Sequence, residues 1–554
     1  MNYVLIFFLS FIITEISTPY IITLFKKVGI VDKPSARKIH SDQTPRMGGI
    51  IIYSVVIIIF QAFYKDISVV KLFFLGSIII FICGIIDDLL DLDWKVKLSL
   101  QSISAILLMM SFIPRFNRIV LFGLDIPYPL NYIILFLFIV GTINSINLMD
   151  GLDGLTSGFA TLAVLFIGFL AYYKDYALLI IITTSMLGVL LAFLKYNSFP
   201  AKIFLGDTGS LILGYFLVFM SIEIMEPFKT PELDLTFPVL LFGVPILDTI
   251  KVMFLRMKAG EIPFTADKKH LHHVIFGSKI RHKTTVFIIH FISILFMINA
   301  LLFLRYHSAF SFLFFFLMGS LLLSAKHFIS MTNRRMENFK RIFGHIFKLP
   351  LITIKIYNNV IIRISIIVFI ILIMVQYRAI TFASEKILLG LLLGETLLFI
   401  LAIYQYKKNM NLTMTYVFFN LFFFFAVNNM IGDKSGSPIV EGYGLYIQYI
   451  YLPFFILAVV VFIFLFGRYS LLSKEYTFLN GMDLTLLSMA IMFFILQPFS
   501  QWSVTGLNYS LIASLVINIW FKILQCYYKR TATFLFFGLF LVNFSILLTS
   551  LLTE

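Results

Sequence analysis

The sequence predicts an all-α, polytopic integral membrane protein with about 18 transmembrane helices, each built from about 20 apolar residues. Hydrophobic residues make up 60% of the 554 and charged residues only 13%, whereas soluble domains carry about a quarter charged residues. The mean hydropathy is +0.98, and apolar runs recur from one end of the sequence to the other. A soluble globular protein and a disordered one are therefore excluded.

Apolar runs bounded by polar, proline or glycine clusters define the predicted spans. We expect residues 1–325 to form one membrane domain, 326–359 a basic cytoplasmic connector, and 360–554 a C-terminal extension of unknown role. The first eleven spans are predicted at 3–25, 47–63, 70–86, 98–113, 131–146, 156–173, 177–194, 211–225, 236–255, 285–304 and 309–325. The extension carries no motif that we recognise, and its seven spans are predicted at 360–376, 387–404, 412–430, 444–467, 483–499, 508–525 and 532–551.

The formal net charge of +15 is distributed unevenly over the predicted loops. Lysine and arginine concentrate in the loops that follow odd-numbered spans, which the positive-inside rule places in the cytoplasm. The N-terminus is then outside, and the first span, which begins without a basic segment, is retained rather than cleaved as a signal peptide. This distribution explains the charge without a nucleic-acid partner. The only two cysteines, Cys83 and Cys526, exclude a disulfide framework.

The loop after the first predicted span contains four cations between helix-breaking prolines and a Gly-Gly pair. Cations at this density suit a phosphate ligand. Ordinary cytoplasmic charge would explain them equally well. The four are Lys33, Arg37, Lys38 and Arg46.

Four carboxylates follow the third predicted span, at Asp87, Asp88, Asp91 and Asp93. Charges at a membrane boundary are costly unless they bind cations or stay hydrated. On a helix Asp87 and Asp88 share a face with Asp91, because they lie four and three residues before it. Such a cluster can hold Mg²⁺ or supply a general base. A hydrated helix end is the alternative.

The fifth predicted span ends in a polar repeat in which Asn144, Asn147, Asp150 and Asp153 recur every three residues. That spacing places them close to one helical face. The spacing of an EF-hand calcium loop is absent. Amides and carboxylates at this depth need partners, which favours a functional site over a plain loop.

The loop that precedes the eighth predicted span reads FLGDTGS, at 204–210. It resembles an anion-binding turn at a helix N-terminus, in which Asp207 supplies one carboxylate ligand for a metal ion. The motif is short, and glycine turns of this kind are common.

Three of the nine histidines, His270, His272 and His273, follow the ninth predicted span. Zinc sites usually place histidines four apart on a helix or pair them with cysteine, and neither pattern is present. Because Arg256 and two lysines flank the histidines, the cluster favours a phosphate-rich anion. A hydrated loop is the alternative.

Five polar clusters are thus predicted on one membrane face, where a soluble nucleotide and a lipid phosphate could meet. Carboxylates, amides and cations gathered in this way are typical of metal-assisted phosphoryl transfer, in which catalysis is mainly positioning and charge neutralisation.

The motifs together resemble the polyprenyl-phosphate N-acetylhexosamine-1-phosphate transferase superfamily, and its WecA/TagO branch more closely than its MraY branch. The resemblance covers about residues 1–325, and the extension has no counterpart in it. It rests on DKPSARKIHSDQTPRMGG, DDLLDL with KLSLQ, NSINLMDGLDGL, FLGDTGS and PFTADKKHLHH, which occur in the family's order.

The resemblance implies transfer of an N-acetylhexosamine-1-phosphate, most often the GlcNAc form, from a UDP-sugar to undecaprenyl phosphate. The products are an undecaprenyl-diphospho-sugar and UMP, and the cofactor is Mg²⁺, with Mn²⁺ as an alternative. The reaction initiates a surface glycan such as O-antigen or teichoic acid at the bacterial cytoplasmic membrane. A homodimer and a downstream glycosyltransferase or flippase are further partners left open.

The resemblance also implies roles for single residues. Asn147 and Asp207 match metal-site positions. Asp87 and Asp88 match an aspartate pair near the lipid phosphate, of which one is a candidate base, and Asp150 matches an essential carboxylate. The predicted substrate-binding residues are Lys97 at a phosphate, Asp153 near the uridine, the cations Arg37, Arg46 and Arg256, and His270, His272 and His273 at the sugar and diphosphate.

A transporter or flippase of lipid-linked sugars is the rival interpretation, because about 18 spans would suit one. Transporters, however, hold ionisable residues near the middle of the membrane, whereas these clusters lie in loops at one face. A purely structural scaffold would leave the five clusters unexplained.

Overall fold

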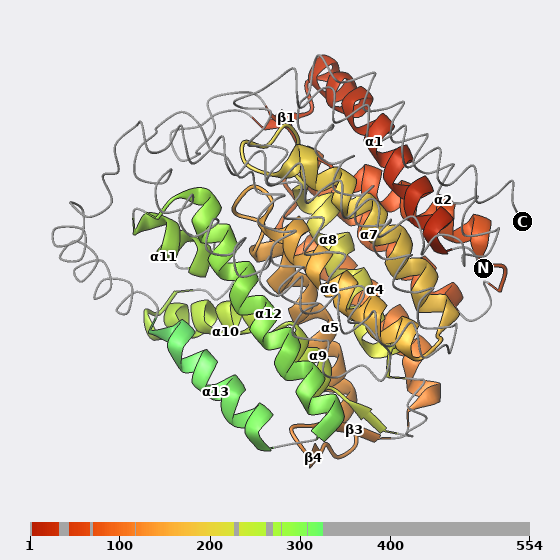
Figure 1. The fold of residues 1–554 in the computed structure, drawn as a ribbon. Helices are drawn as coiled ribbons and strands as arrows, with labels where there is room; N and C mark the ends of the chain where they lie inside the picture. Colours follow the sequence, from red (N-terminus) through yellow and green to blue (C-terminus); the bar gives the residue numbers. More distant parts are fainter. Residues whose placement is uncertain are drawn as a thin grey trace, which may run out of the picture. The chain divides into compact units, whose positions relative to one another are not determined.

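The computed structural model describes residues 3–32, 44–66, 70–116, 118–225, 232–261, 270–278, 280–306 and 309–324. The predicted connector and extension lie outside the described residues, as does Arg37. The fold is therefore reported for most of the predicted membrane domain (Figure 1).

The described residues are mostly helical, as predicted. Seven of their helices are long and apolar enough to cross a membrane, which supports an all-α membrane protein; the total of about 18 spans stays a prediction. The helices are α1 (Tyr3–Val28), α2 (Gly49–Phe63), α3 (Lys71–Leu90), α4 (Trp94–Phe112), α5 (Leu130–Leu148), α6 (Leu155–Tyr173), α7 (Ala177–Asn197), α8 (Gly206–Glu223), α9 (Thr236–Leu241), α10 (Gly243–Lys258), α11 (Leu271–Gly277), α12 (His282–Tyr306) and α13 (Ala309–Leu323).

Helix α8 packs in the interior of this bundle, against α3, α5 and α6. Small residues allow the close approach of α3, as they commonly do between membrane helices. A Cβ on Gly84 would lie 2.8 Å from the backbone nitrogen of Thr208, and one on Gly76 would collide with the Tyr215 hydroxyl. Further along the pair, the rings of Phe73 and Phe219 stack with centroids 3.9 Å apart. The end of α3 is thereby held against the beginning of α8.

The prediction of one continuous ninth span at 236–255 was wrong, because two helices, α9 and α10, meet there at Phe242 and Gly243. Proline has no N–H and is tolerated in the first turn of a helix, which is where Pro245 lies in α10. A Cβ on Gly243 would collide with the Phe296 ring of α12. Helix α10, which begins after this break, carries the residue that contacts the beginning of α11.

Five short strands, which the sequence did not reveal, tie loops together at the two ends of the bundle (Figure 1). Strand β1 (Val31–Asp32) pairs antiparallel with β2 (Thr44–Pro45). Strand β3 (Arg118–Leu121) pairs antiparallel with β4 (Leu124–Asp125) and parallel with β5 (Glu232–Asp234). The second sheet joins the loops that follow the fourth and eighth spans, so these two loops share one end, as the counting of spans predicted.

Candidate active site

The N-terminus of α8 is capped by a carboxylate from another helix. Asp88, near the end of α3, accepts hydrogen bonds from the backbone N–H groups of Asp207 at 3.0 Å and Thr208 at 2.9 Å, and from the Thr208 hydroxyl at 2.6 Å. A negative charge is favourable at this end of a helix, where N–H groups lack partners within the helix. Asp88 therefore fixes where Asp207 stands.

Gly206 makes this cap sterically feasible. Its backbone adopts φ +74°, a conformation that favours glycine, and a Cβ there would lie 2.6 Å from Asp88 Oδ2. The segment around Arg46 is tied to the same turn, because the N–H groups of Gly48 and Gly49 donate to the carbonyls of Phe204 and Leu205. The FLGDTGS and TPRMGG motifs are thus brought side by side.

Lys97 lies at the centre of the polar cluster. Its Nζ is 2.5 Å from Asp87 Oδ2 and 2.5 Å from Asp207 Oδ1. Asn147 Nδ2, at the end of α5, donates to the same Asp207 oxygen at 2.9 Å. Asp87 is further held by the N–H of Leu92, which donates to Oδ1 at 2.9 Å. Four predicted site residues, each at the end of a different helix (α3, α4, α5 and α8), therefore meet in one cluster.

The carboxylates of this cluster differ in accessibility. The Asp207 side chain is 36% exposed, whereas that of Asp87 is 8% exposed and Asp88 is buried. Asp207 is therefore the carboxylate that a ligand can approach.

The segment between α5 and α6 carries the two remaining predicted aspartates. Burial raises the pKa of Asp150 from its ordinary value near 3.8 to about 8, and the charge of Asp207 adds to the shift. Asp153 has a different environment: its Oδ2 accepts from the N–H of Ala201 at 2.9 Å, and its own N–H donates to His282 Nε2 at 3.2 Å. Asp153 thus joins three segments, whereas Asp150 is a carboxyl that holds its proton near neutral pH.

The histidine segment begins α11 and rests on an aspartate that the sequence analysis did not select. Asp248 of α10 accepts from the N–H of Leu271 at 2.8 Å through Oδ1, and its Oδ2 is 2.9 Å from His270 Nδ1. The signal was present, because an ionisable residue inside an apolar run is a functional candidate by default. It was missed because Asp248 fell within the predicted ninth span.

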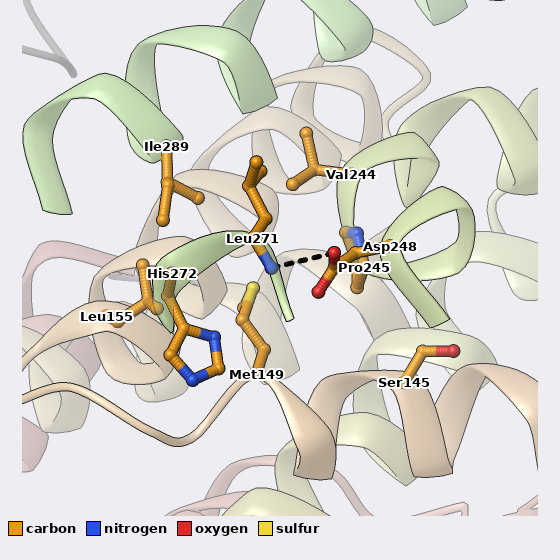
Figure 2. Close-up of a pocket in the computed structure, with 9 residues that line it drawn as sticks. All are labelled: Ser145, Met149, Leu155, Val244, Pro245, Asp248, Leu271, His272 and Ile289. Carbon is orange, nitrogen blue, oxygen red and sulfur yellow. Dashed lines mark hydrogen bonds between the residues drawn. The ribbon is translucent and has the colours of Figure 1, made fainter. Parts of the chain in front are cut away.

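His272 connects the histidine segment to the segment between α5 and α6 that carries Asp150 and Asp153. A Cβ on Gly151 would collide with His272 Nε2, so only glycine permits this approach beside Asp150. Figure 2 shows His272, Met149 and Leu271 among the side chains that line a small pocket, with the hydrogen bond from the Leu271 N–H to Asp248 drawn as a dashed line. Burial and the neighbouring His273 lower the pKa of His272 to about 3, so its ring is neutral. The pocket is lined by Ser145, Met149, Leu155, Val244, Pro245, Asp248, Leu271, His272 and Ile289.

The predicted cations lie at different distances from this centre. Arg46 Nη1 is 3.8 Å from Asp91 Oδ1, at the margin of the cluster. Arg256 is buried on α10, and His273 follows His272 on α11 with ring centroids 4.2 Å apart. Within the described ranges the structure therefore brings the aspartates, Asn147 and Lys97 together, and links the histidines to them through Gly151.

The donor chemistry of this cluster fits a hard divalent cation. Asp207 and Asn147 supply oxygen ligands, and Mg²⁺ is typically held by one or two carboxylates while phosphates and waters complete its shell. Among the residues that the structure describes, no group of three or more His, Cys, Asp or Glu forms a preformed metal cage.

Comparisons with known proteins point to one family. The model of glycosyl transferase family 4 matches residues 70–225, which include the aspartate, asparagine and FLGDTGS segments. A probable undecaprenyl-phosphate N-acetylglucosaminyl 1-phosphate transferase of Bacillus subtilis is 33% identical over 308 residues, which are 54% of this chain and 84% of the relative.

Two further relatives are named undecaprenyl-phosphate alpha-N-acetylglucosaminyl 1-phosphate transferases. The protein of Thermotoga maritima is 31% identical over 52% of this chain and 85% of its own length. That of Escherichia coli K12 is 25% identical over 45% of this chain and 70% of its own length. Since the alignments cover most of each relative and the shared motifs form one cluster, the chain belongs to glycosyl transferase family 4, the polyprenyl-phosphate N-acetylhexosamine-1-phosphate transferase superfamily that its motifs predicted.

Proposed function

We propose that this protein transfers GlcNAc-1-phosphate from UDP-GlcNAc to undecaprenyl phosphate, giving undecaprenyl-diphospho-GlcNAc and UMP. A phosphate oxygen of the lipid forms a bond to the β-phosphorus of the nucleotide sugar, and the bond from that phosphorus to the oxygen bridging to UMP breaks. The proposal is supported by the family and by the acceptor and sugar in the names of its relatives. The product would initiate a surface glycan such as O-antigen or teichoic acid.

The observation that carries the proposal is the position of Lys97 between Asp87 and Asp207 at the beginning of α8. Both reactants are anionic and repel one another, so bringing two phosphates together requires fixed positive charge. The two carboxylates hold the ammonium group in place, and Lys97 can turn toward a phosphate oxygen without leaving the cluster. The ion pair therefore prepares a cation at the point where the two substrates meet.

We assign the divalent ion to Asp207 and Asn147, with Mg²⁺ as the preferred metal and Mn²⁺ as an alternative. Mg²⁺, when bound, would neutralise charge on the diphosphate as UMP leaves. Asp207 is suited to this role because its side chain is the more exposed of the two carboxylates that contact Lys97. Asn147 donates to Asp207 through its amide nitrogen and thereby orients the carboxylate.

The two adjacent aspartates receive different roles in this proposal. Asp88 is a positioning residue, because both of its oxygens accept hydrogen bonds from the first turn of α8. Asp87 faces Lys97 and is the better candidate for contact with the lipid phosphate. A phosphate monoester with a second pKa near 6 is largely ionised at neutral pH, so holding the Lys97 ammonium group toward the phosphate is a more useful role for Asp87 than removing a proton.

The remaining predicted residues are proposed to bind the nucleotide sugar. Asp150, a carboxyl that holds its proton near neutral pH, can donate a hydrogen bond to a phosphate or sugar oxygen, and we assign Asp153 to contact with the uridine. Lys97, Arg46, Arg256 and the histidine segment surround the path of the diphosphate. Arg37 is kept as a phosphate-binding residue on the strength of the sequence alone.

We further propose that this end of the bundle faces the cytoplasm of a bacterium and that the N-terminus is outside. The support is the charge distribution: the loops predicted on this side of the membrane together hold most of the lysines and arginines that precede residue 326. The transferase part is assigned to residues 1–325, and the extension at 360–554 would bring the total to about 18 spans.

The test is transfer by the purified full-length chain in proteoliposomes that contain undecaprenyl phosphate. With radiolabelled UDP-GlcNAc and Mg²⁺ we expect label to appear in a lipid product, together with stoichiometric UMP. UDP-GalNAc as a parallel donor tests the choice of sugar. A transporter would instead move a preformed lipid-linked sugar between leaflets and release no UMP, so the absence of UMP would reject the transferase.

A further inference from the structure

Asp248 makes two hydrogen bonds that together determine how the histidine segment begins. Oδ1 accepts the N–H of Leu271, the first residue of α11, and Oδ2 pairs with His270 Nδ1. The side chain of His270, the N-cap residue itself, makes no capping bond. The cap of α11 is therefore supplied from α10, by a residue 23 positions earlier in the chain.

The bond to His270 decides which ring nitrogen carries the proton. A carboxylate only accepts hydrogen bonds, so Nδ1 must be the donor, and Nε2 of a neutral ring is then an acceptor. His270 is 4% exposed, and its Nε2 is buried with no hydrogen-bond partner among the residues that the structure describes. A buried polar atom is normally satisfied, so an open Nε2 indicates a ligand group.

The residues around Asp248 support a specific role for its contact with His270. Lys251, buried one turn later on α10, has its Nζ 3.7 Å from Asp248 Oδ1 and balances the buried charge. The rings of His270 and His272 are parallel, with centroids 5.9 Å apart, so the orientation of the first constrains the second. His272 in turn lies against Gly151, in the segment between α5 and α6.

We propose that Asp248 is the positioning residue of the histidine segment: it fixes the tautomer and orientation of His270 so that Nε2 meets a polar group of the nucleotide sugar. This rests on the transferase function proposed above for the choice of ligand, but not for the geometry. Asp248 touches no reacting atom and acts through His270.

The substitution Asp248→Asn changes the contact with His270 while keeping the hydrogen bond that caps α11. An amide has one acceptor oxygen, and the N–H of Leu271 can only donate, so the amide oxygen stays with Leu271 and the NH₂ group faces His270. Nδ1 must then accept, and the proton moves to Nε2. Asp234→Asn is the matched control, because Asp234 accepts from the N–H of Thr236 at 2.9 Å at the beginning of α9, without contacting a histidine.

The first readout is kinetic. Removing the outer-shell partner of a metal-bound histidine typically costs about 10- to 100-fold in activity, and we expect kcat/KM for UDP-GlcNAc to fall by a similar factor in Asp248→Asn. The KM for undecaprenyl phosphate should stay within about twofold, because the proposal assigns the lipid phosphate to Asp87 and the nucleotide sugar to His270. In a His270→Gln background Asp248→Asn should cost little more, whereas a merely structural residue would give additive losses.

The second readout does not need activity. In the full-length chain labelled with [¹⁵N]histidine, the His270 signals are identified by their disappearance in His270→Gln. We expect a protonated Nδ1 in the wild type and a protonated Nε2 in Asp248→Asn. The same tautomer in both proteins, or additive kinetic losses, would overturn the proposal. A wild type that transfers no sugar phosphate yet shows the tautomer change would reject the transferase function and leave the positioning role standing.

Discussion

At the scale of single residues, the site depends on how one ammonium group is shared. Lys97 contacts Asp87 and Asp207 at the same distance, and Asn147 contacts the Asp207 oxygen that Lys97 also binds. A partly buried ion pair contributes little net stability once the cost of desolvating both charges is counted. Its role here is geometric, because it fixes the Lys97 ammonium group and the Asp207 carboxylate relative to one another.

Replacing Lys97 by glutamine tests this directly. The variant keeps hydrogen-bonding capacity but removes the charge that offsets repulsion between two anionic substrates. We expect transfer to fall by at least about 100-fold, as loss of an electrostatic group in a catalytic site typically causes. The matched control is Lys95→Gln on the same helix, where the side chain is exposed, and it should retain near wild-type transfer. Equal losses in both variants would assign the effect to α4 as a whole.

The raised pKa of Asp150 predicts how stability depends on pH. Because its folded pKa of about 8 lies above its ordinary value near 3.8, the folded state binds the proton more tightly. The stability that this group contributes is therefore fully present below about pH 4 and is lost as the pH rises through about 8, a change on the order of a few kcal/mol. Thermal unfolding of the detergent-solubilised protein without substrates or divalent ions should show this decline, and Asp150→Asn should reduce it. An unchanged pH slope in the variant would contradict the shift.

At the scale of elements, the approach of α3 to α8 is what makes the site. The glycines on α3 allow backbone contact, and Asp88 then bonds the first turn of α8. Sequence analysis predicted both helices and identified the four aspartates at the end of α3 as a candidate functional cluster. It could not predict which aspartate caps and which pairs with lysine, because that depends on the rotation of α3 about its own axis.

Gly84→Leu should therefore separate the two helices at the site. A Cβ at this position would lie 2.8 Å from the Thr208 nitrogen, so a leucine forces α8 away from Asp88. We expect transfer to be lost and the free energy of unfolding to fall by about 1–3 kcal/mol, as overpacking usually costs. Gly141→Leu on α5 is the control, since a Cβ there meets nothing within 4 Å. Wild-type transfer by Gly84→Leu would show that the contact is not needed.

The break between α9 and α10 explains what sequence reasoning missed. Hydropathy reports one apolar run across 236–255, and it does not register that Gly243 and Pro245 divide the run into two helices. Asp248 was overlooked for the same reason. The short strands were also missed, because two- to four-residue strands leave no periodicity to detect.

At the scale of the whole molecule, counting spans was more informative than any single motif. It assigned the loops that carry the aspartate, asparagine, FLGDTGS and Gly-Gly segments to one face, and the structure brings these segments into contact. Counting tolerates errors in helix boundaries, because shifting a boundary by a few residues does not change which loops share a side; the number of spans and the side of the membrane stay predictions. The finer arrangement followed from side-chain packing, which the sequence does not encode locally.

The proposed sidedness is tested by single cysteines in a Cys83→Ala, Cys526→Ala background. A cysteine at Asp93, near the cluster, should react with a membrane-impermeant maleimide only after the cells are opened. A cysteine at Asp175, in the loop between α6 and α7, should react in intact cells. The reverse pattern would place the polar cluster outside and contradict the use of a cytoplasmic nucleotide sugar.

The central claim is that one polar cluster at the beginning of α8 performs phosphoryl transfer, and Asp207→Asn tests it most directly. The substitution keeps size and hydrogen bonding but removes the exposed charge proposed to hold the metal. In proteoliposomes with undecaprenyl phosphate, UDP-GlcNAc and Mg²⁺, we predict that formation of labelled lipid falls by at least about 1,000-fold. Asp175→Asn, at an exposed aspartate in the loop between α6 and α7, should transfer normally. Wild-type transfer by a properly inserted Asp207→Asn protein would contradict the account.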